Sequence, residues 1–443
     1  MVLLIFTASL SLLSYQQFAL KTLLMIQIRQ LALGLLAVLT TTSQAQDIAR
    51  PSLGGDRAAF PIYSSPIPAS RYNVKAGPVK MLFNASVGAS YNSNVNVSED
   101  NPIGSFVLSP RVGMGVYWPI TKLNKLRLNV SLGYDYYFSD PELGGQTLLV
   151  SPDTELMFNI FAGDVQITFF DRPSITNNPV DNPSLSDAVN YTILNNTAGI
   201  NISWDLNDVL LGAGFSNFIN YALNDDFDYL NRISNQVFAN ASFLVLPYLR
   251  VGLEGSATGT VYSEGANAGS NALNNNLDYT LGGFAQGTIS RYLEWSGGVG
   301  WQITDFNESN NPLNTGNYSK PYFYFNIDNT LNRYFSHRLS TGFEGVPSSE
   351  SNSLALFYVR YSFNWMLIRD WSLGGSAFFE NGTESDGPNS EDFNRVGANI
   401  SLSYQLSEHW VMTLFVGGLT KGSTVSSYDY TQQQFGGIVT YTF

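Results

Sequence analysis

The chain has 443 residues, of which 44% are hydrophobic and only 13% are charged. The charged share is about half that of an ordinary soluble domain, so fewer side chains than usual need to face bulk water. A formal net charge of −13 argues against a phosphate-binding surface and therefore against nucleic acid as a partner, and the lack of cysteine excludes disulfides, lipoprotein acylation and thiolate metal sites.

The N-terminal part of the sequence predicts a targeting segment. An internal methionine, Met25, begins a stretch that contains Arg29, an apolar run follows from Leu31 to Leu39, and the small residues Ser43 and Ala45 precede a cleavage position. The run is about half of the roughly 20 residues that a membrane-spanning helix needs, which argues against the alternative of an anchor. We expect residues 1–45 to be a signal-peptide region that is removed, with translation starting at Met25.

Residues 46–79 are rich in proline and glycine and show no clear period. We interpret them as a periplasmic extension or as a short segment that enters a lumen as a plug. Too few apolar residues are present for a second folded domain.

From Lys80 onward, apolar and polar residues alternate over many segments. Leu126, Leu128 and Val130 share one face of such a segment, while Arg127 and Asn129 share the other. The pattern predicts an all-β fold, a transmembrane antiparallel up-and-down β-barrel over residues 80–443, with about 18 strands and 16 as the alternative. The expected strands are 81–92, 105–118, 125–138, 147–160, 164–171, 190–204, 208–221, 230–246, 248–262, 275–290, 292–305, 319–332, 337–346, 353–367, 370–381, 394–406, 409–419 and 432–443.

The connections alternate between tight and long. Tight ones occur near Asn207 and Pro247, and the long ones at 263–276, 307–319 and 381–394 are rich in Asn, Ser, Gly and Asp. This is typical of short periplasmic turns and longer external loops. Acidic residues in the loops favour hydration, and divalent cations bridging them to lipopolysaccharide are the alternative.

The C-terminal residues form one apolar edge of a strand. Phe435, Val439, Tyr441 and Phe443 are spaced in steps of two or four. The pattern resembles the C-terminal signal of bacterial outer-membrane barrels, which the barrel-assembly machinery reads. We therefore expect these four residues to be a barrel-assembly signal that faces lipid.

Charged residues within the strands fall on the polar phase. They must face water or one another, because placing a charged side chain in lipid would cost free energy. In one interpretation, these residues form cross-strand ion pairs that stiffen the wall. In the other, the two signs of charge lie on opposite sides of a pore and set up a transverse field that orders polar solutes. The candidate lumen-facing charges are Arg111, Arg127, Asp135, Arg232, Arg250, Glu254, Asp278, Glu294, Asp328, Arg338, Glu344, Arg360, Glu380 and Arg395.

No catalytic or metal-binding arrangement is expected. The two histidines, His337 and His409, lie beside predicted periplasmic turns, whereas barrel enzymes carry their sites at the outer rim. There is no HExxH motif and no cysteine, so we predict no reaction, no cofactor and no metal. The seven tryptophans fall near strand ends on the apolar phase, which favours an interfacial girdle.

Residues Tyr72 to Val95 resemble the opening of the β-barrel porin 2 family, in which a GPV-like entry leads to a strand ending in Y-x-x-N-(I/V). Gly77, Pro78, Tyr91 and Asn94 match this pattern, and Ser93 stands where Asp is common. The segment from Asn231 to Tyr262 looks like the repeated hairpin of that family, with a Pro-aromatic turn. The resemblance implies an outer-membrane barrel, and some relatives are associated with exopolysaccharide secretion.

The expected function is a monomeric, porin-like passive channel for small hydrophilic solutes. The alternatives are exopolysaccharide export and a non-conducting surface scaffold. Loops folded inward would favour the channel, and a long acidic or aromatic track would favour export. The expected partners are outer-membrane lipid and lipopolysaccharide, the barrel-assembly machinery, and small solutes or polysaccharide.

Overall fold

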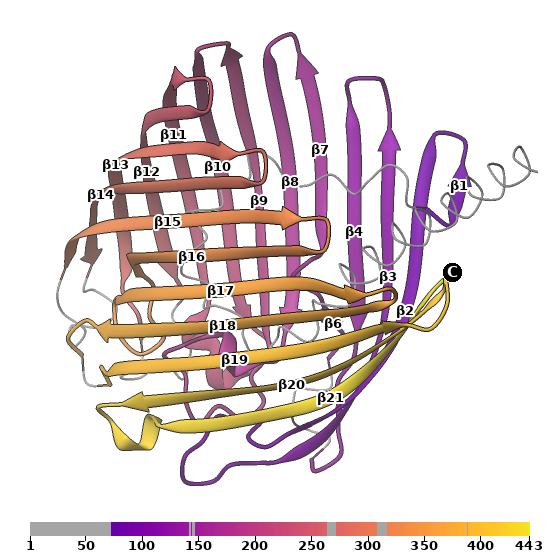
Figure 1. Cartoon of the computed structure of the whole chain (residues 1–443). Helices are drawn as coiled ribbons and strands as arrows, with labels where there is room; N and C mark the ends of the chain where they lie inside the picture. Colours follow the sequence, from indigo (N-terminus) through magenta and orange to yellow (C-terminus); the bar gives the residue numbers. More distant parts are fainter. Residues whose placement is uncertain (1–71, 141–142, 144–146, 264–271, 308–316, 388) are drawn as a thin grey trace, which may run out of the picture.

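The computed structural model describes residues 72–140, 143, 147–263, 272–307, 317–387 and 389–443. The predicted signal region and residues 46–71 of the predicted extension lie outside the described residues. All strands belong to one antiparallel sheet, which closes because β2 pairs with β3 on one edge and with β21 on the other. The result is a barrel with long strands and an enclosed interior (Figure 1).

Eighteen strands make up the wall, each antiparallel to the next. This confirms the predicted up-and-down barrel and excludes the alternative of 16 strands. They are β2 (Val79–Asn92), β3 (Ser105–Pro119), β4 (Lys125–Gly133), β7 (Glu155–Ala162), β8 (Val165–Thr176), β9 (Ile193–Leu206), β10 (Val209–Ala222), β11 (Arg232–Leu246), β12 (Leu249–Tyr262), β13 (Asn275–Ser290), β14 (Leu293–Asn307), β15 (Tyr318–Asn332), β16 (Phe335–Val346), β17 (Leu354–Ile368), β18 (Trp371–Glu384), β19 (Asp392–Gln405), β20 (Trp410–Ser423) and β21 (Tyr430–Thr442).

Two predicted strands are interrupted. Instead of running continuously over 125–138, β4 ends at Gly133, and β5 (Tyr136–Tyr137) resumes the pairing with β3. Instead of 147–160, a short β6 (Leu149–Val150) pairs with the end of β4 before β7 begins. The four residues between β6 and β7 form a bulge. The Ser131 carbonyl oxygen of β4 accepts from the Ser151 amide at 2.9 Å, and the Ser131 amide donates to the Thr154 hydroxyl at 3.4 Å.

A short strand precedes the wall, within the segment expected to be an extension. β1 (Val74–Ala76) pairs with the first residues of β2, on the same edge that β21 occupies farther along. At the point on this edge of β2 between the pairings with β1 and with β21, the Asn73 side chain donates to the Phe83 carbonyl oxygen at 3.0 Å and accepts from the Phe83 amide at 3.1 Å. The two ends of the chain therefore share one strand edge.

The two ends of the barrel differ. The turn end carries tight connections, in which Asn207 and Asp370 adopt a left-handed backbone with φ of 66° that Asn and Asp tolerate. The loop end carries loop 1 (93–104), loop 2 (138–148), loop 3 (177–192), loop 4 (223–231), loop 5 (263–274), loop 6 (308–317), loop 7 (347–353), loop 8 (385–391) and loop 9 (424–429). The loop predicted at 381–394 is shorter, because β18 and β19 both extend into it. Among the described residues of these loops lie the 3-10 helices η3 (Pro179–Asp181), η4 (Asp225–Leu230) and η6 (Ser426–Tyr428).

The outer face of the wall is apolar. Leu253 on β12, Leu281 on β13 and Val299 on β14 project outward, and Leu281 is 70% exposed. Aromatic pairs gather at the turn end, among them Trp410 with Tyr441 at 4.8 Å between ring centroids. A closed ladder with such a surface is a membrane-spanning barrel of the outer-membrane type, since closure leaves no unpaired edge in lipid. No helix among the described residues is long and apolar enough to cross a membrane.

Candidate functional site

Loop 3 folds into the barrel and crosses its interior. It leaves the wall between β8 and β9, yet the amide of Ala188 donates to the Asn96 carbonyl oxygen of loop 1 at 2.8 Å. The hydroxyl of Ser184 lies 3.3 Å from that of Ser348 in loop 7, which joins β16 to β17 on the far side of the barrel. Loop 3 therefore spans the lumen.

Buried charges attach loop 3 to the wall opposite its own strands. The Arg395 guanidinium on β19 donates to the Val180 carbonyl oxygen at 2.9 Å. On β20, the Lys421 ammonium donates to the Ser186 hydroxyl at 3.2 Å and pairs with Glu391 at 2.6 Å. The side chains of Arg395, Lys421 and Glu391 are fully buried. Removing one partner of such a pair would leave an uncompensated charge, so these contacts fix the position of the loop.

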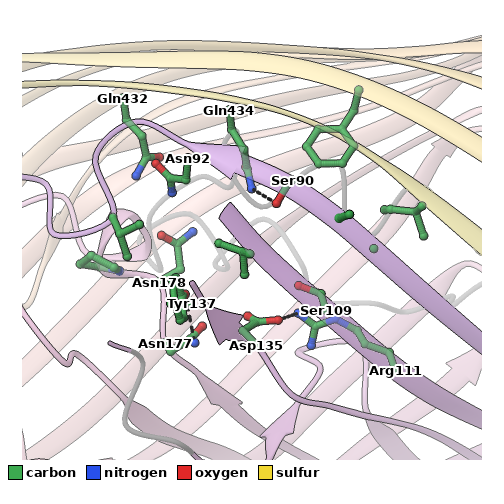
Figure 2. A pocket seen from close by; sticks show the side chains of 17 residues that line it. Ser90, Asn92, Ser109, Arg111, Asp135, Tyr137, Asn177, Asn178, Gln432 and Gln434 are labelled. Carbon is green, nitrogen blue, oxygen red and sulfur yellow. Dashed lines mark hydrogen bonds and ion pairs between the residues drawn. The ribbon is translucent and has the colours of Figure 1, made fainter. Parts of the chain in front are cut away.

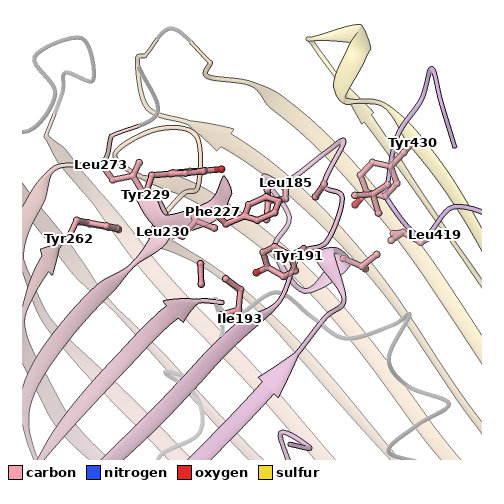
Figure 3. Close-up of a cluster of buried hydrophobic side chains, with 14 of the residues drawn as sticks. Leu185, Tyr191, Ile193, Phe227, Tyr229, Leu230, Tyr262, Leu273, Leu419 and Tyr430 are labelled. Carbon is pink, nitrogen blue, oxygen red and sulfur yellow. The ribbon is translucent and has the colours of Figure 1, made fainter. Parts of the chain in front are cut away.

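An apolar core holds the inward loops together at the loop end. Leu185 of loop 3 packs in one cluster with Val97 of loop 1, Phe227 and Leu230 of η4 in loop 4, and Leu273 of loop 5 (Figure 3). Tyr191 meets Phe227 edge to face at 5.3 Å. The loops thus form a packed structure with its own core, and the loop end of the barrel is narrowed by it.

Loop 3 separates two cavities of different size. Residues 181–183 line a cavity of about 600 Å³, whose wall is formed by β8 to β14 and β16. Residues 177–179 line a cavity of about 90 Å³ bounded by β2, β3, β20 and β21 (Figure 2). More than half of the residues lining the large cavity carry a hydroxyl or amide side chain. The interior beside the loop therefore offers many hydrogen-bonding groups and is large enough for a small solute.

Loop 7 also bends inward at one wall of the large cavity. The pairing of β15 with β16 stops at Phe323 and Phe343, and Pro321 of β15 has no amide with which to continue it. The Gln302 side chain on β14 instead brackets the backbone of Gly345, donating to its carbonyl oxygen at 3.0 Å and accepting from its amide at 2.9 Å. A side chain from β14 thus replaces the missing sheet contacts.

Several of the predicted lumen charges are paired. Arg111 and Asp135 form an ion pair of 3.0 Å that lines the small cavity. Glu380 lies between two arginines, at 3.4 Å from Arg360 and 3.5 Å from Arg395. Cross-strand pairing, one of the two predicted interpretations, accounts for these residues.

A further group of predicted charges lies near the turn end. In the strand register, Asp328 on β15 lies opposite Glu294 on β14 and opposite Arg338 on β16. It forms an ion pair with Arg338. Arg250 donates to the Asn207 carbonyl oxygen at 3.1 Å, and an Arg127 nitrogen lies 2.7 Å from the Met157 sulfur. These residues lie away from the large cavity.

Three predicted charges line the large cavity. Arg232 stacks on Phe218, with 5.4 Å from its guanidinium to the ring centroid. Asp278 accepts from Gln302 at 2.6 Å and from Thr304 at 2.7 Å. Glu344 is buried. Asp181 of loop 3 and Arg172, which pairs with Glu155 at 2.8 Å, complete the charged lining, and the prediction had not placed them there.

Glu254 is reached by tyrosines from three strands away. Tyr322 on β15 and Glu254 on β12 lie in one row of cross-strand partners. The two positions between them in this row are both glycine, Gly282 on β13 and Gly300 on β14. The Tyr322 hydroxyl donates to Glu254 at 3.0 Å, and that of Tyr324 donates to its other oxygen at 2.9 Å. A Cβ added at Gly282 would lie 2.2 Å from the Tyr322 oxygen. Glycine is required here because the ring crosses the backbone.

The assembly-signal residues lie on the outer face of β21. Phe435 and Val439 are exposed, as is the terminal Phe443, and the rings of Tyr441 and Phe443 meet at 5.0 Å. Recognition of this edge by an assembly machinery remains a prediction. Of the histidines, His409 bonds the Thr442 carbonyl oxygen at 2.7 Å and His337 contacts Asn329 at 3.1 Å. The described part of the chain holds no group of three or more His, Cys, Asp or Glu arranged to bind a metal.

Of the residues that hold loop 3, Arg395 was among the predicted charges, but two others were missed from the sequence. Lys421 lies two residues beyond the predicted end of its strand, and Glu391 lies in a predicted loop. A usable signal existed in loop 3 itself. Val180, Leu185 and Ala188 are apolar residues in a connection rich in Asn, Asp and Ser, and all three are buried.

Comparison with known proteins gives the following. No family model matches the chain and no curated protein matches its sequence, so the resemblance to the β-barrel porin 2 family stays a prediction. The crystal structure of the outer membrane protein opdK from Pseudomonas aeruginosa shows 8% identity and a TM-score of 0.44 over 82% of this chain and 99% of that chain. A BenF-like porin from Pseudomonas fluorescens Pf-5 shows 8% identity and a TM-score of 0.46 over 82% and 98%. OccK2 (OpdF) from Pseudomonas aeruginosa, solved in complex with glucuronate, shows 10% identity and a TM-score of 0.45 over 82% of this chain and 98% of that chain. Identities and TM-scores this low assign no function to the chain.

Proposed function

We propose that the protein is an integral channel of the bacterial outer membrane through which small hydrophilic solutes pass passively. The observation that carries this proposal is the inward course of loop 3, which leaves a polar cavity of about 600 Å³ beside it. An unobstructed barrel of 18 strands would be wide and unselective. A loop fixed across the lumen reduces that width to the size of a small solute.

The same geometry disfavours polysaccharide export. An export conduit would need a continuous track for a long polymer, whereas loops 1, 3, 4 and 5 form a shared apolar core at the loop end. The lining of the large cavity is also dominated by hydroxyl and amide groups rather than by acids or aromatic rings. A non-conducting scaffold would give no reason for a polar cavity beside a tethered loop.

The charges in the cavity set the expected ion preference. Its lining has three carboxylates, on Asp181, Asp278 and Glu344, and two guanidiniums, one of which pairs with Glu155. We expect a mild preference for cations, read as the sign of the reversal potential in a salt gradient.

The test uses single cysteines, for which the chain is suited because it contains none. Thr258→Cys places a thiol in the large cavity, and Ala257→Cys places one on the outer face of the same strand, because neighbouring residues point to opposite faces. In planar bilayers, a charged methanethiosulfonate reagent should reduce the single-channel current of the first variant only. Folded barrels that carry no current would contradict the channel and favour the scaffold.

A further inference from the structure

Side chains with hydroxyl and amide groups line the large cavity from one strand to the next, among apolar side chains such as Phe218 and Phe306. Each of the seven neighbouring strands from β8 to β14 contributes at least one such side chain to it. Such groups both donate and accept hydrogen bonds, so together they satisfy a solute whatever the direction of each of its own groups. This surface faces loop 3 across the cavity.

Pairs of these side chains are ordered across the strands. The hydroxyls of Ser234 and Thr260 lie 2.8 Å apart, and Gln236 donates to the hydroxyl of Thr258 at 3.2 Å. Each pair uses only part of the hydrogen-bonding capacity of its members, because a hydroxyl has one donor and two acceptor positions. All four residues line the cavity, so the remaining positions are available to a solute there.

A strong donor lies at one side of this surface. The Arg232 guanidinium lines the cavity and lies between the rings of Phe218 and Tyr262, at 5.4 and 6.0 Å, with a buried Nε that has no hydrogen-bond partner. Within the part of the chain that the structure describes, no carboxylate lies within ion-pair distance of it. A guanidinium held flat in this way can donate two parallel bonds to adjacent oxygen atoms.

An acceptor and aromatic faces complete the lining. Asp278 accepts bonds from two neutral side chains, Gln302 and Thr304, which hold its carboxylate in place. The ring of Phe218 lines the cavity, and Tyr191 of loop 3, which is buried against Phe227, closes one edge of it. Arg232 on β11 and Asp278 on β13 place opposite charges on the same wall, two strands apart, so a solute with a single charge is attracted by one and repelled by the other, whereas a neutral solute with many hydroxyls can use both.

We propose that the large cavity is a binding site for neutral polyhydroxylated solutes of the size of a mono- or disaccharide, with the Ser234–Thr260 pair and Arg232 as specificity-determining groups. A volume of about 600 Å³ is within the range of sites for a single small molecule. This proposal rests on the proposed channel function and names its solute class.

The test is current block in planar bilayers with glucose and maltose as probes and tri(ethylene glycol) as a flexible probe that lacks the array of hydroxyls. Maltose should interrupt the current in discrete, concentration-dependent events, and the glycol should not. The double variant Ser234→Ala with Thr260→Val should shorten the blocked time about 3- to 10-fold, because it removes two hydroxyls without removing bulk. Arg232→Met should shorten it as well and serves as a second variant if the first folds poorly.

The matched control removes a hydroxyl pair of the same geometry outside the cavity. Ser403 on β19 and Thr413 on β20 lie 2.9 Å apart on the inner face, and Ser403→Ala with Thr413→Val should leave the blocked time unchanged. Equal block by sugar and glycol, or equal blocked times in the two double variants, would overturn the sugar site while leaving the channel intact. If no variant conducts, the channel itself fails, and calorimetric titration of the folded protein with maltose then decides the binding site, with no heat of binding counting against it.

Discussion

The Arg395 guanidinium donates to the Val180 carbonyl oxygen at 2.9 Å, and this bond joins β19 to a loop that begins on the other side of the barrel. Both residues are fully buried. Arg395 is also the direct cross-strand partner of Glu380. One side chain therefore belongs both to the wall and to the constriction.

Replacing Arg395→Met together with Glu380→Gln should loosen loop 3 and widen the channel. The double change removes the buried Arg395–Glu380 pair as a unit, because losing one partner alone can cost about 3–5 kcal/mol. Arg360, the other partner of Glu380, keeps some contact with water because its side chain is 16% exposed. We expect a larger and noisier single-channel conductance than in the unmodified protein. The control is Arg338→Met with Asp328→Asn, an ion pair whose side chains are 65% and 48% exposed. Conductance that changes equally in both variants would contradict a specific role for Arg395.

The packing of the inward loops should depend on pH through Glu350 in loop 7. Withdrawal from water raises the pKa of its carboxyl to about 8, and the neighbouring Glu384 adds to the shift. The folded protein holds this proton to a higher pH than the unfolded chain, whose ordinary value is 4.5. The resulting stabilisation is complete below the ordinary value and is lost as the pH rises through 8.

We therefore expect proteolysis of the loops and channel noise to increase as the pH is raised through 8. Glu350→Gln should remove that step, because an amide does not titrate. Tyr229, Glu384, Glu391 and Lys421 also face Glu350, so a step that survives in the variant would assign the effect to one of them. Glu408→Gln, an exposed acid at the turn end, is the control and should leave the step in place.

Gly282→Ala should destabilise the barrel, because the Tyr322 ring passes over this position on its way to Glu254. The added Cβ would lie 2.2 Å from the Tyr322 oxygen, and displacing the ring also costs its hydrogen bond. We expect a loss of about 1–3 kcal/mol, measured as the urea midpoint of the refolded protein. Gly422→Ala, where a Cβ meets no atom within 4 Å, should leave the midpoint unchanged. Equal midpoints would show that the tyrosine moves aside freely.

Phe443→Ala should reduce the amount of barrel inserted in the outer membrane in cells and have little effect on refolding into detergent in vitro. Its side chain is 56% exposed on the outer face and supports little of the structure, so a strong effect in cells points to recognition during assembly. Phe106→Ala on β3 removes a comparably exposed ring, at 61%, away from the C-terminus. Matching losses in the two variants would contradict a signal role for the C-terminal residue.

Alternation of apolar and polar residues was sufficient to predict the wall, because one face of every strand contacts lipid and the other contacts the lumen. All 18 predicted strands correspond to observed ones, and their limits mostly agree within a few residues. The interruption after Gly133 could not be predicted, because alternation continues through Tyr134 and Tyr136 and the pairing with β3 resumes at Tyr136 in the same register.

The constriction was beyond the reach of local sequence patterns. The bond from Arg395 to Val180 joins residues 215 positions apart, and that from Lys421 to Ser186 joins residues 235 apart. Such contacts leave no period in the sequence. Alternation was sufficient to place Arg395 and Glu380 on the inner face. It could not predict that a loop would cover them.

The course of loop 3 also has a mechanical consequence. A barrel of this size has no central core, so its circular cross-section resists the lateral pressure of a membrane only through the curvature of its sheet. A loop attached to β8 and β9 at its ends and to β19 and β20 at its centre acts as an internal strut. Flattening or expansion of the barrel must move this strut, so the shape of the wall and the width of the passage change together.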